Sequence, residues 1–207
     1  MSTDEKTGIQ ALERNAPDLP MSIGQVRKRE YEYTRHGTLC LIANWDVVEG
    51  KILSPTISET RQEEDFLRHI QQTVQNQPDV KGWCIITDNL NTHQSESLVV
   101  WVASLQGIQG QELGIKGKKG ILKSMESRAA FLQQNDHFVH FMYTPKHCSW
   151  LNQIEIWFGI LARKVIRRGS FKSKQELAER LMQFIQYFNA VLSKPFKWNY
   201  GGKPCYT

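Results

Sequence analysis

The sequence lacks the features that mark several large classes of protein. Its 207 residues contain no internal repeat, no low-complexity tract and no apolar run near the roughly 20 residues that a membrane span needs. The first residues, MSTDEKTG, show neither the basic start nor the apolar stretch of a secretory signal. These absences favour a cytoplasmic protein. A composition that is 40% hydrophobic and 23% charged suits one globular domain with a sizeable core.

Cysteine is sparse, and its placement argues against metal or disulfide chemistry. The four cysteines (Cys40, Cys84, Cys148 and Cys205) include no CxxC pair. Cys40 and Cys84 lie in apolar stretches, so we interpret them as buried free thiols. His147 and Cys148 lack a second ligand pair at the usual spacing, and we therefore reject a zinc site.

Charge is distributed unevenly along the chain. Residues 144–207 contain 11 Lys and Arg against 3 Asp and Glu, which gives +8. Residues 1–143 contain 15 basic and 18 acidic residues, which gives −3 and accounts for the total of +5. A basic C-terminal third favours binding of a polyanion such as nucleic acid, although a solvated basic face would show the same pattern.

The first part of the chain has the pattern of β-structure. Residues 3–14 predict a short strand that runs into a turn or loop. Three further runs, 29–33, 38–48 and 51–57, are separated by the turn signals His-Gly and Glu-Gly. We expect them to form an antiparallel meander.

Helices and buried strands alternate in the rest of the chain. Apolar residues at helical spacing predict helices over 58–74, 95–105, 125–135, 149–168 and 172–192. Two nearly continuous apolar runs, 82–88 and 138–144, predict strands buried on both faces, whereas Gly- and Lys-rich residues 106–120 predict an exposed loop. This order predicts an α/β fold with a mixed sheet flanked by helices.

Three acidic residues stand where a metal site could form. Asp88 ends the strand 82–88, at the carboxyl edge where ligand sites of α/β sheets gather. Asp4 lies near the start of the first strand, and Glu155 lies in the first turns of a largely apolar helix. Oxygen ligands of this kind select Mg²⁺ or Mn²⁺. Each acid also has an ordinary interpretation: Asp88 as a helix cap, Asp4 as a solvated terminal residue and Glu155 as an exposed helix residue.

Six segments carry motifs that resemble one known family: DEKTGIQALER (4–14), REYEYTRHGT (29–38), ITDNLNTH (86–93), YTPKHCSWLNQIEIWFGIL (143–161), GSFKSKQEL (169–177) and YFNAVLSKPFKWNY (187–200). Together they look like the catalytic domain of DDE transposases. The resemblance is strongest to the bacterial insertion-sequence branch related to the mariner elements. It covers essentially the whole chain, which we expect to be one catalytic domain over 1–207.

The resemblance implies a fold, a site and a reaction. The fold would be similar to RNase H and retroviral integrase, and the acidic triad would map onto Asp4, Asp88 and Glu155. In that family the triad binds two Mg²⁺ ions. Two ions about 4 Å apart activate the attacking oxygen and stabilise the leaving one at phosphorus. Water would first nick the DNA at the element end, and the freed 3′-hydroxyl would then attack target DNA.

Supporting roles are weaker inferences from the same motifs. Asn89 and His93 follow Asp88 and would orient water, metal or phosphate, although a structural hydrogen bond is the ordinary role for His93. His147 and Asn152 precede Glu155 and would contact DNA or shape the metal pocket. The candidates for binding DNA phosphates are Lys116, Lys118, Lys119, Arg163, Lys164, Arg167 and Arg168.

Two departures from the family pattern bear on the function. Asp88 and Glu155 are 67 positions apart, wider than is usual in the mariner group, and residues 106–134 look like an insertion that accounts for the difference. We expect no helix-turn-helix region of the kind that precedes the catalytic domain in the family. Because Met1 stands only three residues before Asp4, we also expect a shortened first strand, as in a truncated or split transposase.

These observations leave three hypotheses. The first is a transposase that cuts and joins double-stranded DNA, working as a homodimer when full-length and located in the cytoplasm at the nucleoid. The second is a catalytically inactive remnant that binds DNA or intact transposase. The third, an RNase H-like nuclease acting on RNA–DNA hybrids, shares the fold but has no support from the motifs.

Overall fold

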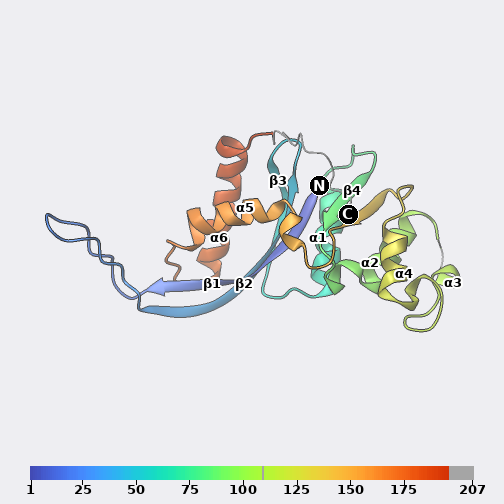
Figure 1. Cartoon of the computed structure of the whole chain (residues 1–207), viewed down its shortest axis with the longest axis horizontal. Helices are drawn as coiled ribbons and strands as arrows, with labels where there is room; N and C mark the ends of the chain where they lie inside the picture. Colours follow the sequence, from blue (N-terminus) through green and yellow to red (C-terminus); the bar gives the residue numbers. More distant parts are fainter. Residues whose placement is uncertain (109, 196–207) are drawn as a thin grey trace, which may run out of the picture.

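The computed structural model of the chain describes residues 1–108 and 110–195, and within them it shows an α/β fold with one mixed sheet flanked by helices (Figure 1). The sheet has five strands in the order β3-β2-β1-β4-β5. Their bounds are β1 Ser2–Arg14, β2 Tyr33–Asp46, β3 Lys51–Ser58, β4 Trp83–Thr87 and β5 Val139–Tyr143. The predicted fold class is therefore confirmed. Cys205 and the end of the last family-like segment lie outside the described residues.

The antiparallel half of the sheet is built on a first strand that is longer than the sequence indicated. β1 has 13 residues and pairs with β2 from Ser2↔Trp45 to Arg14↔Tyr33. The expectation of a short first strand was wrong, because Ile9 and Ala11 continue the inward-facing alternation and β2 supplies partners along the whole length. A register shift between Lys6 and Ile9 accommodates Gly8, whose φ of 64° suits glycine.

The hairpin that joins β1 to β2 differs from the predicted meander. Residues 29–33 do not form a strand of their own. Tyr33 begins β2, and the residues before it belong to a narrow ribbon that projects from the sheet (Figure 1) and is closed by bridges such as Leu19↔Lys28. Tyr31 in this segment is 81% exposed, so no core contact extends the strand over it. The predicted His-Gly turn is instead an irregularity inside β2, where Gly37 has a φ of 110°. The Glu-Gly turn was correctly predicted and joins β2 to β3.

The parallel half of the sheet consists of β4 and β5 beside β1. β4 pairs with β5 over five residues, from Trp83↔Val139 to Thr87↔Tyr143. β4 meets β1 at a single register pair, Ser2↔Ile86, and the two strands then separate. The carboxyl end of β4 therefore faces the early residues of β1 across an opening in the sheet, the place where α/β sheets hold ligands.

Helices cover both faces of the sheet. The α-helices are α1 Glu63–Gln75, α2 Glu96–Leu105, α3 Gly110–Leu113, α4 Met125–Leu132, α5 Ile154–Leu161 and α6 Lys174–Tyr187. One core packs α5 and α6 on the antiparallel strands, and a second packs α1, α2 and α4 on the opposite face. β2 serves both cores, since Leu41 belongs to the first and Ile42 to the second. Within the described residues, no helix combines the length and apolarity needed to cross a membrane.

Three helical predictions need correction. The predicted single helix over 172–192 is divided into α6 and a π-helical turn at Phe188–Leu192. The predicted single helix over 149–168 is divided into a 3₁₀ turn at Ser149–Leu151, α5, and a π-helical turn at Ala162–Ile166, where the Arg167 N–H bonds to the Ala162 carbonyl at 2.9 Å. The predicted loop over 106–120 contains the short helix α3, because Leu113 is buried and anchors it. The free thiol of Cys40 is buried as predicted, but Cys84 is only partly buried.

Candidate functional site

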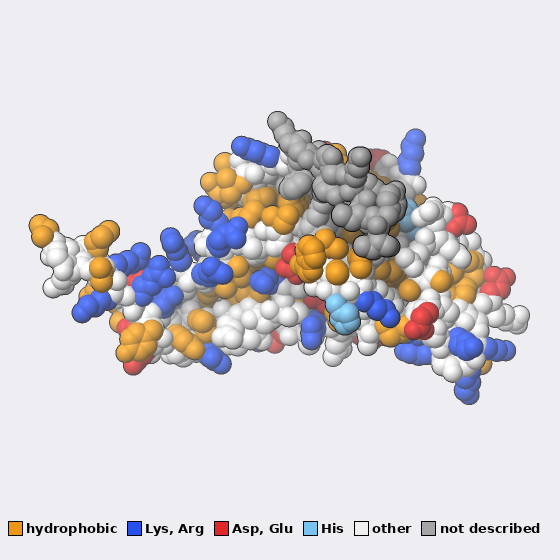
Figure 2. All heavy atoms as spheres, in the orientation of Figure 1, with side chains coloured by type: hydrophobic (Ala, Val, Ile, Leu, Met, Phe, Trp, Pro, Cys, Tyr) orange, Lys and Arg blue, Asp and Glu red, His pale blue; other side chains and the backbone are white. Residues whose placement is uncertain are grey.

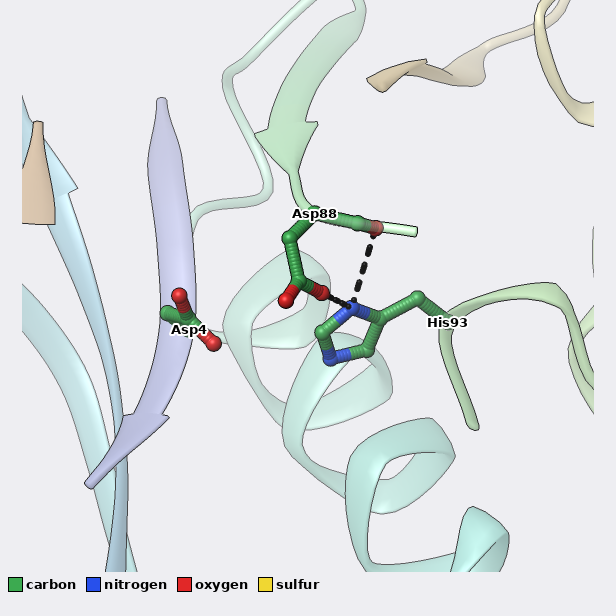
Figure 3. Close-up of side chains that lie close together, drawn as sticks. All are labelled: Asp4, Asp88 and His93. Atoms are coloured by element: carbon green, nitrogen blue, oxygen red, sulfur yellow. Dashed lines mark hydrogen bonds and ion pairs between the residues drawn. The ribbon is translucent and has the colours of Figure 1, made fainter. Parts of the chain in front are cut away.

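Asp4 and Asp88, which are distant in sequence, lie side by side at the opening between β1 and β4. Figure 3 shows their carboxylates directed towards the same space, with the ring of His93 beside them. One ligand atom from each of these three residues lies within 4.8 Å of the others. Two carboxylates and an imidazole held this close form the only such group with metal-ligand character among the described residues.

The loop after β4 begins at Asp88 and brings His93 back beside that aspartate. Asp88 Oδ1 accepts a hydrogen bond from the Leu90 N–H at 3.0 Å, which turns the chain directly after the strand. A 3₁₀ helix, Asn91–Gln94, then brings His93 back under the strand end. The motif DNLNTH therefore encodes a closed loop that sets the imidazole against its own Asp88.

His93 is fully buried between two acidic side chains. Its Nδ1 lies 2.8 Å from Asp88 Oδ1 and its Nε2 lies 2.9 Å from Glu5 Oε2. Burial alone would lower the pKa of His93, but the hydrogen bonds to Asp88 and Glu5 outweigh it and raise the pKa from 6.5 to about 9. The imidazolium therefore donates from both nitrogens at neutral pH.

The two aspartates differ in their titration because their surroundings differ. Burial raises the pKa of Asp4 from 3.8 to about 7, with the nearby negative charge of Asp88 adding to the effect and the Glu5 N–H opposing it. The hydrogen bond from His93 holds the pKa of Asp88 below its usual range. A cation placed between the two carboxylates would remove the repulsion that Asp4 experiences.

Asn152 connects Asp4 to the start of α5. This fully buried amide donates to the Thr3 carbonyl at 2.8 Å and to Asp4 Oδ2 at 3.3 Å, and it accepts from Ser2 Oγ. Ser2 Oγ in turn accepts from the Ile154 N–H at 2.9 Å, at the first residue of α5. The side chain of Asn152 therefore has a positioning role between β1 and α5.

Glu155 does not join the two aspartates. It lies in the first turn of α5, three residues beyond Asn152, but its side chain is exposed and is not part of the group within 4.8 Å. The structure therefore brings together two of the three predicted acids and adds His93 to them.

A cavity of about 530 Å³ opens beside Asp88. It is lined by the loop after β4 and by residues 144–149, including Lys146 and His147. His147 adopts a φ of 62°, a left-handed conformation that non-glycine residues rarely hold. The Asn89 side chain donates to the Thr144 carbonyl and so joins the two walls of this cavity.

The comparison with protein families gives one match. A family model described as DDE superfamily endonuclease matches residues 1–178. The chain belongs to this family. The search of curated proteins and the search of solved structures each found no match. Membership of a DDE endonuclease family agrees with the mixed sheet and with carboxylates at the carboxyl edge of β4.

The basic residues predicted to bind DNA lie on two separate surfaces of this endonuclease domain. Arg163, Lys164, Arg167 and Arg168 are exposed at and just after the π-helical turn that follows α5. Lys116, Lys118 and Lys119 are exposed on a turn closed by the bridge Ile115↔Lys119, and Lys116 forms an ion pair with Glu96 at 3.2 Å. Both surfaces are accessible to a large ligand.

Sequence analysis missed Glu5 and the other groups that hold His93. Glu5 points to the face of β1 opposite Asp4, and its side chain is only 6% exposed. Thr87 Oγ1 lies 2.8 Å from His93 Nδ1, and the Tyr143 hydroxyl donates to the His93 carbonyl at 2.9 Å. No pattern in the residues near Glu5 indicated its contact with His93, because that contact depends on how β1 lies beside β4.

Proposed function

We propose that this chain is the catalytic domain of an insertion-sequence transposase that cuts and joins DNA strands with the help of divalent metal ions. The observation that carries the proposal is the approach of Asp4 and Asp88 within 4.8 Å at the opening of the sheet. Membership of the DDE superfamily endonucleases supports a reaction at phosphodiester bonds. The finer assignment to insertion-sequence transposition rests on the resemblance of the sequence motifs.

The donor atoms of the site fit a hard divalent cation. Asp4 and Asp88 present oxygen ligands, which Mg²⁺ and Mn²⁺ prefer. His93 is unsuited as a ligand in this arrangement, because both of its nitrogens donate to carboxylates. We therefore assign the metal to Asp4 and Asp88, and we assign His93 to orienting Asp88. A bound cation would polarise the phosphate and lower the pKa of a coordinated water.

Glu155 is proposed as the third acid of the site. The Asn152 network fixes the first turn of α5 against Asp4, so the backbone of Glu155 stays close to the aspartates while its side chain is free to change rotamer. Two ions, as in the family that the motifs resemble, would require this third carboxylate. Lys146 and His147 line the cavity beside Asp88 and would face the phosphate of a bound strand.

The proposal is tested by nicking of a supercoiled plasmid and of labelled linear duplexes, with Mg²⁺, with Mn²⁺ and with EDTA. We expect metal-dependent nicking that falls at least about 100-fold in Asp4→Asn and Asp88→Asn, since a lost ligand typically costs most of the chemistry. Glu155→Gln should show the same loss with a smaller change in metal affinity. The control Glu64→Gln alters an exposed acid on α1 and should leave the rate unchanged.

The alternatives give different outcomes in the same assay. Preference for an RNA–DNA hybrid over duplex DNA would favour the RNase H-like nuclease. Salt-sensitive DNA binding without any metal-dependent nicking would favour the inactive remnant. Nicking that survives both aspartate substitutions would overturn the site itself.

A further inference from the structure

A second hollow, remote from the aspartates, gathers positive charge where α6 packs beside the end of the α5 segment. It has a volume of about 390 Å³, and its lining includes Lys164, Arg168 and Arg180 around Phe171, Phe184 and Tyr187. We call these six residues the basic hollow. No carboxylate lines it, and in residues 1–108 and 110–195 none of its three cations forms an ion pair.

The basic hollow is fixed to the far end of β1. The Phe171 N–H donates to the Leu12 carbonyl at 2.8 Å, and the Arg14 N–H donates to Ser170 Oγ at 2.9 Å. Arg168 also lines an adjoining hollow together with Arg14 and Arg27, where Arg27 forms an ion pair with Asp18 at 2.6 Å. In Figure 2, Lys and Arg side chains gather in the region of α5, α6 and the base of the projecting hairpin. The hydrogen bonds to Leu12 and Arg14 therefore fix the basic hollow to the end of β1, and Arg14 and Arg168 extend its positive charge into the adjoining hollow.

The shape of the basic hollow favours phosphate over a stacked base. Phe171 is 2% exposed, Phe184 is partly buried, and only Tyr187, at 52%, presents much of its ring. Aromatic residues that stack on single-stranded bases need open faces. These rings form the floor, while the exposed ammonium and guanidinium groups form the rim, which suits a phosphodiester backbone.

The segment from Glu155 to Arg168 gives an approximate distance between the basic hollow and the first turn of α5, which Asn152 joins to Asp4. α5 begins at the Asn152 joint beside Asp4, and Arg168 lies 13 residues after Glu155. The segment includes the π-helical turn, and at about 1.5 Å per residue its length is about 20 Å. With about 3.4 Å of duplex axis for each phosphate of one strand, this separation corresponds to about six base pairs along the axis.

We propose that the basic hollow binds the backbone of duplex DNA about six base pairs from the phosphate held at Asp4 and Asp88. The inference rests on the proposed function for its spacing, but the binding itself does not depend on cleavage. Lys164 and Arg168 were already predicted from the sequence to bind DNA. The structure adds Arg180 and places the three cations around one hollow.

The first experiment measures binding in EDTA, so that no cleavage is required. Affinity of the whole chain for a 30-base-pair duplex is followed over a series of salt concentrations, for the wild type and for the triple variant Lys164→Gln, Arg168→Gln, Arg180→Gln. We expect the slope of log affinity against log salt to fall by about 2 to 3, because each lost phosphate contact removes about 0.9. The control triple Arg61→Gln, Lys81→Gln, Lys123→Gln removes three exposed cations outside the hollow and should change the slope by less than about 1.

The outcomes separate this inference from the proposed function. The proposal for the basic hollow is overturned if the triple variant of the hollow binds DNA with an unchanged salt slope while its circular dichroism and Tm match the wild type. This conclusion holds even if the chain nicks DNA. A reduced slope in a chain that never nicks supports the hollow and rejects the proposed function. Equal loss of affinity for poly-glutamate would show a general polyanion surface and overturn the assignment to DNA.

The spacing is tested on a duplex whose nick position has been mapped. Single methylphosphonate linkages, which remove one phosphate charge, are placed at successive positions from the nick. A linkage five to seven base pairs from the nick should weaken binding by the wild type but not by the triple variant of the basic hollow. This result would support the distance estimated from the helical rise of about 1.5 Å per residue. Sensitivity confined to other positions overturns it.

Discussion

The positive charge on His93 offsets the electrostatic repulsion between the two acidic side chains beside it. Glu5 and Asp88 would repel each other across the base of the site if the ring between them were neutral. Because the pKa of His93 is raised to about 9 in the folded chain, the folded state favours the protonated ring. Its contribution to stability is fully present below pH 6.5, the ordinary value, and is lost as the pH rises through about 9.

The substitution His93→Gln should therefore destabilise the protein most at low pH. We expect a Tm lower than that of the wild type by several degrees at pH 6, and a smaller difference at pH 10. Removal of one partner from a buried, hydrogen-bonded charge network typically costs about 3–5 kcal/mol. Differential scanning calorimetry in metal-free buffer at the two pH values measures it. A difference that grows towards pH 10 would contradict the assignment.

Substitution of Asp4 should change Tm in the opposite direction to substitution of His93, although the pKa of Asp4 is also raised and its contribution to stability also falls as the pH rises. Its pKa is raised from 3.8 to about 7, so the folded state binds this proton more tightly than the unfolded state does. Stability is consequently lost as the pH rises between those values, and the ionised carboxylate destabilises the fold above about pH 7. Asp4→Asn should raise Tm at pH 8 by a few degrees and leave it unchanged near pH 3.5. Mg²⁺ should stabilise the wild type at pH 8 but not the variant, and equal stabilisation of both would contradict a site at Asp4.

The sequence was informative for Asp88 and uninformative for Glu5, for a physical reason. Asp88 follows an apolar strand, and the ends of such strands are where sites form, so one local pattern was enough. The contact between Glu5 and His93 depends on the pairing of β1 with β4 and on which face of β1 each residue takes. Neither is encoded in the residues near Glu5. The exposed position of Glu155 likewise depends on how α5 is rotated about its axis.

Among the elements, the joint between β1 and α5 depends on one amide. Asn152 satisfies the Thr3 carbonyl, Asp4 and Ser2 in a fully buried place. Asn152→Ala should lower the free energy of unfolding by about 2–3 kcal/mol, because the remaining buried groups lose their partner. Urea denaturation followed by circular dichroism measures this. Asn76→Ala, at an exposed helix end, is the control and should cost less than about 1 kcal/mol.

Gly169 determines how the segment after α5 closes the basic hollow. A Cβ at this position would lie 2.1 Å from Phe171 Cζ and 2.8 Å from the Val165 carbonyl oxygen. Gly169→Ala should force Phe171 from its buried place and destabilise the chain by about 1–3 kcal/mol. Gly110→Ala is the matched control, since nothing lies within 4 Å of its Cβ. Equal Tm values for the two variants would show that the ring has room to move.

The errors of element prediction have a common origin. Hydrophobic periodicity located β4, β5 and α6, because each buries a local pattern. It failed where pairing or packing with a distant segment decides the outcome. The length of β1 is set by β2, Gly37 is absorbed as an irregularity within a paired strand, and the π-helical turn after α5 is an adjustment of hydrogen bonding that side-chain periodicity does not report.

At the scale of the whole molecule, two cores on opposite faces share one sheet. Leu181 is fully buried in the first core and Ile85 in the second. Leu181→Ala and Ile85→Ala should each lower the free energy of unfolding by about 2–5 kcal/mol. Because β2 contributes to both cores, we expect each variant to unfold in a single transition. Tryptophan fluorescence and circular dichroism should give the same urea midpoint, and separated midpoints would show that the cores unfold independently.

The single register pair between β1 and β4 has a mechanical consequence. The sheet consists of an antiparallel part (β1, β2 and β3) and a parallel part (β4 and β5), which have a single register pair, Ser2↔Ile86. Asp4 belongs to the first part, and Asp88 directly follows β4 in the second. Backbone hydrogen bonding resists relative movement of the two parts only weakly there. Side chains that join them, such as His93 between Glu5 and Asp88, must therefore provide much of the resistance. Any ligand that bridges the two aspartates would link the two parts of the sheet. Its arrival would stiffen the molecule across its width, far beyond the few atoms that it touches.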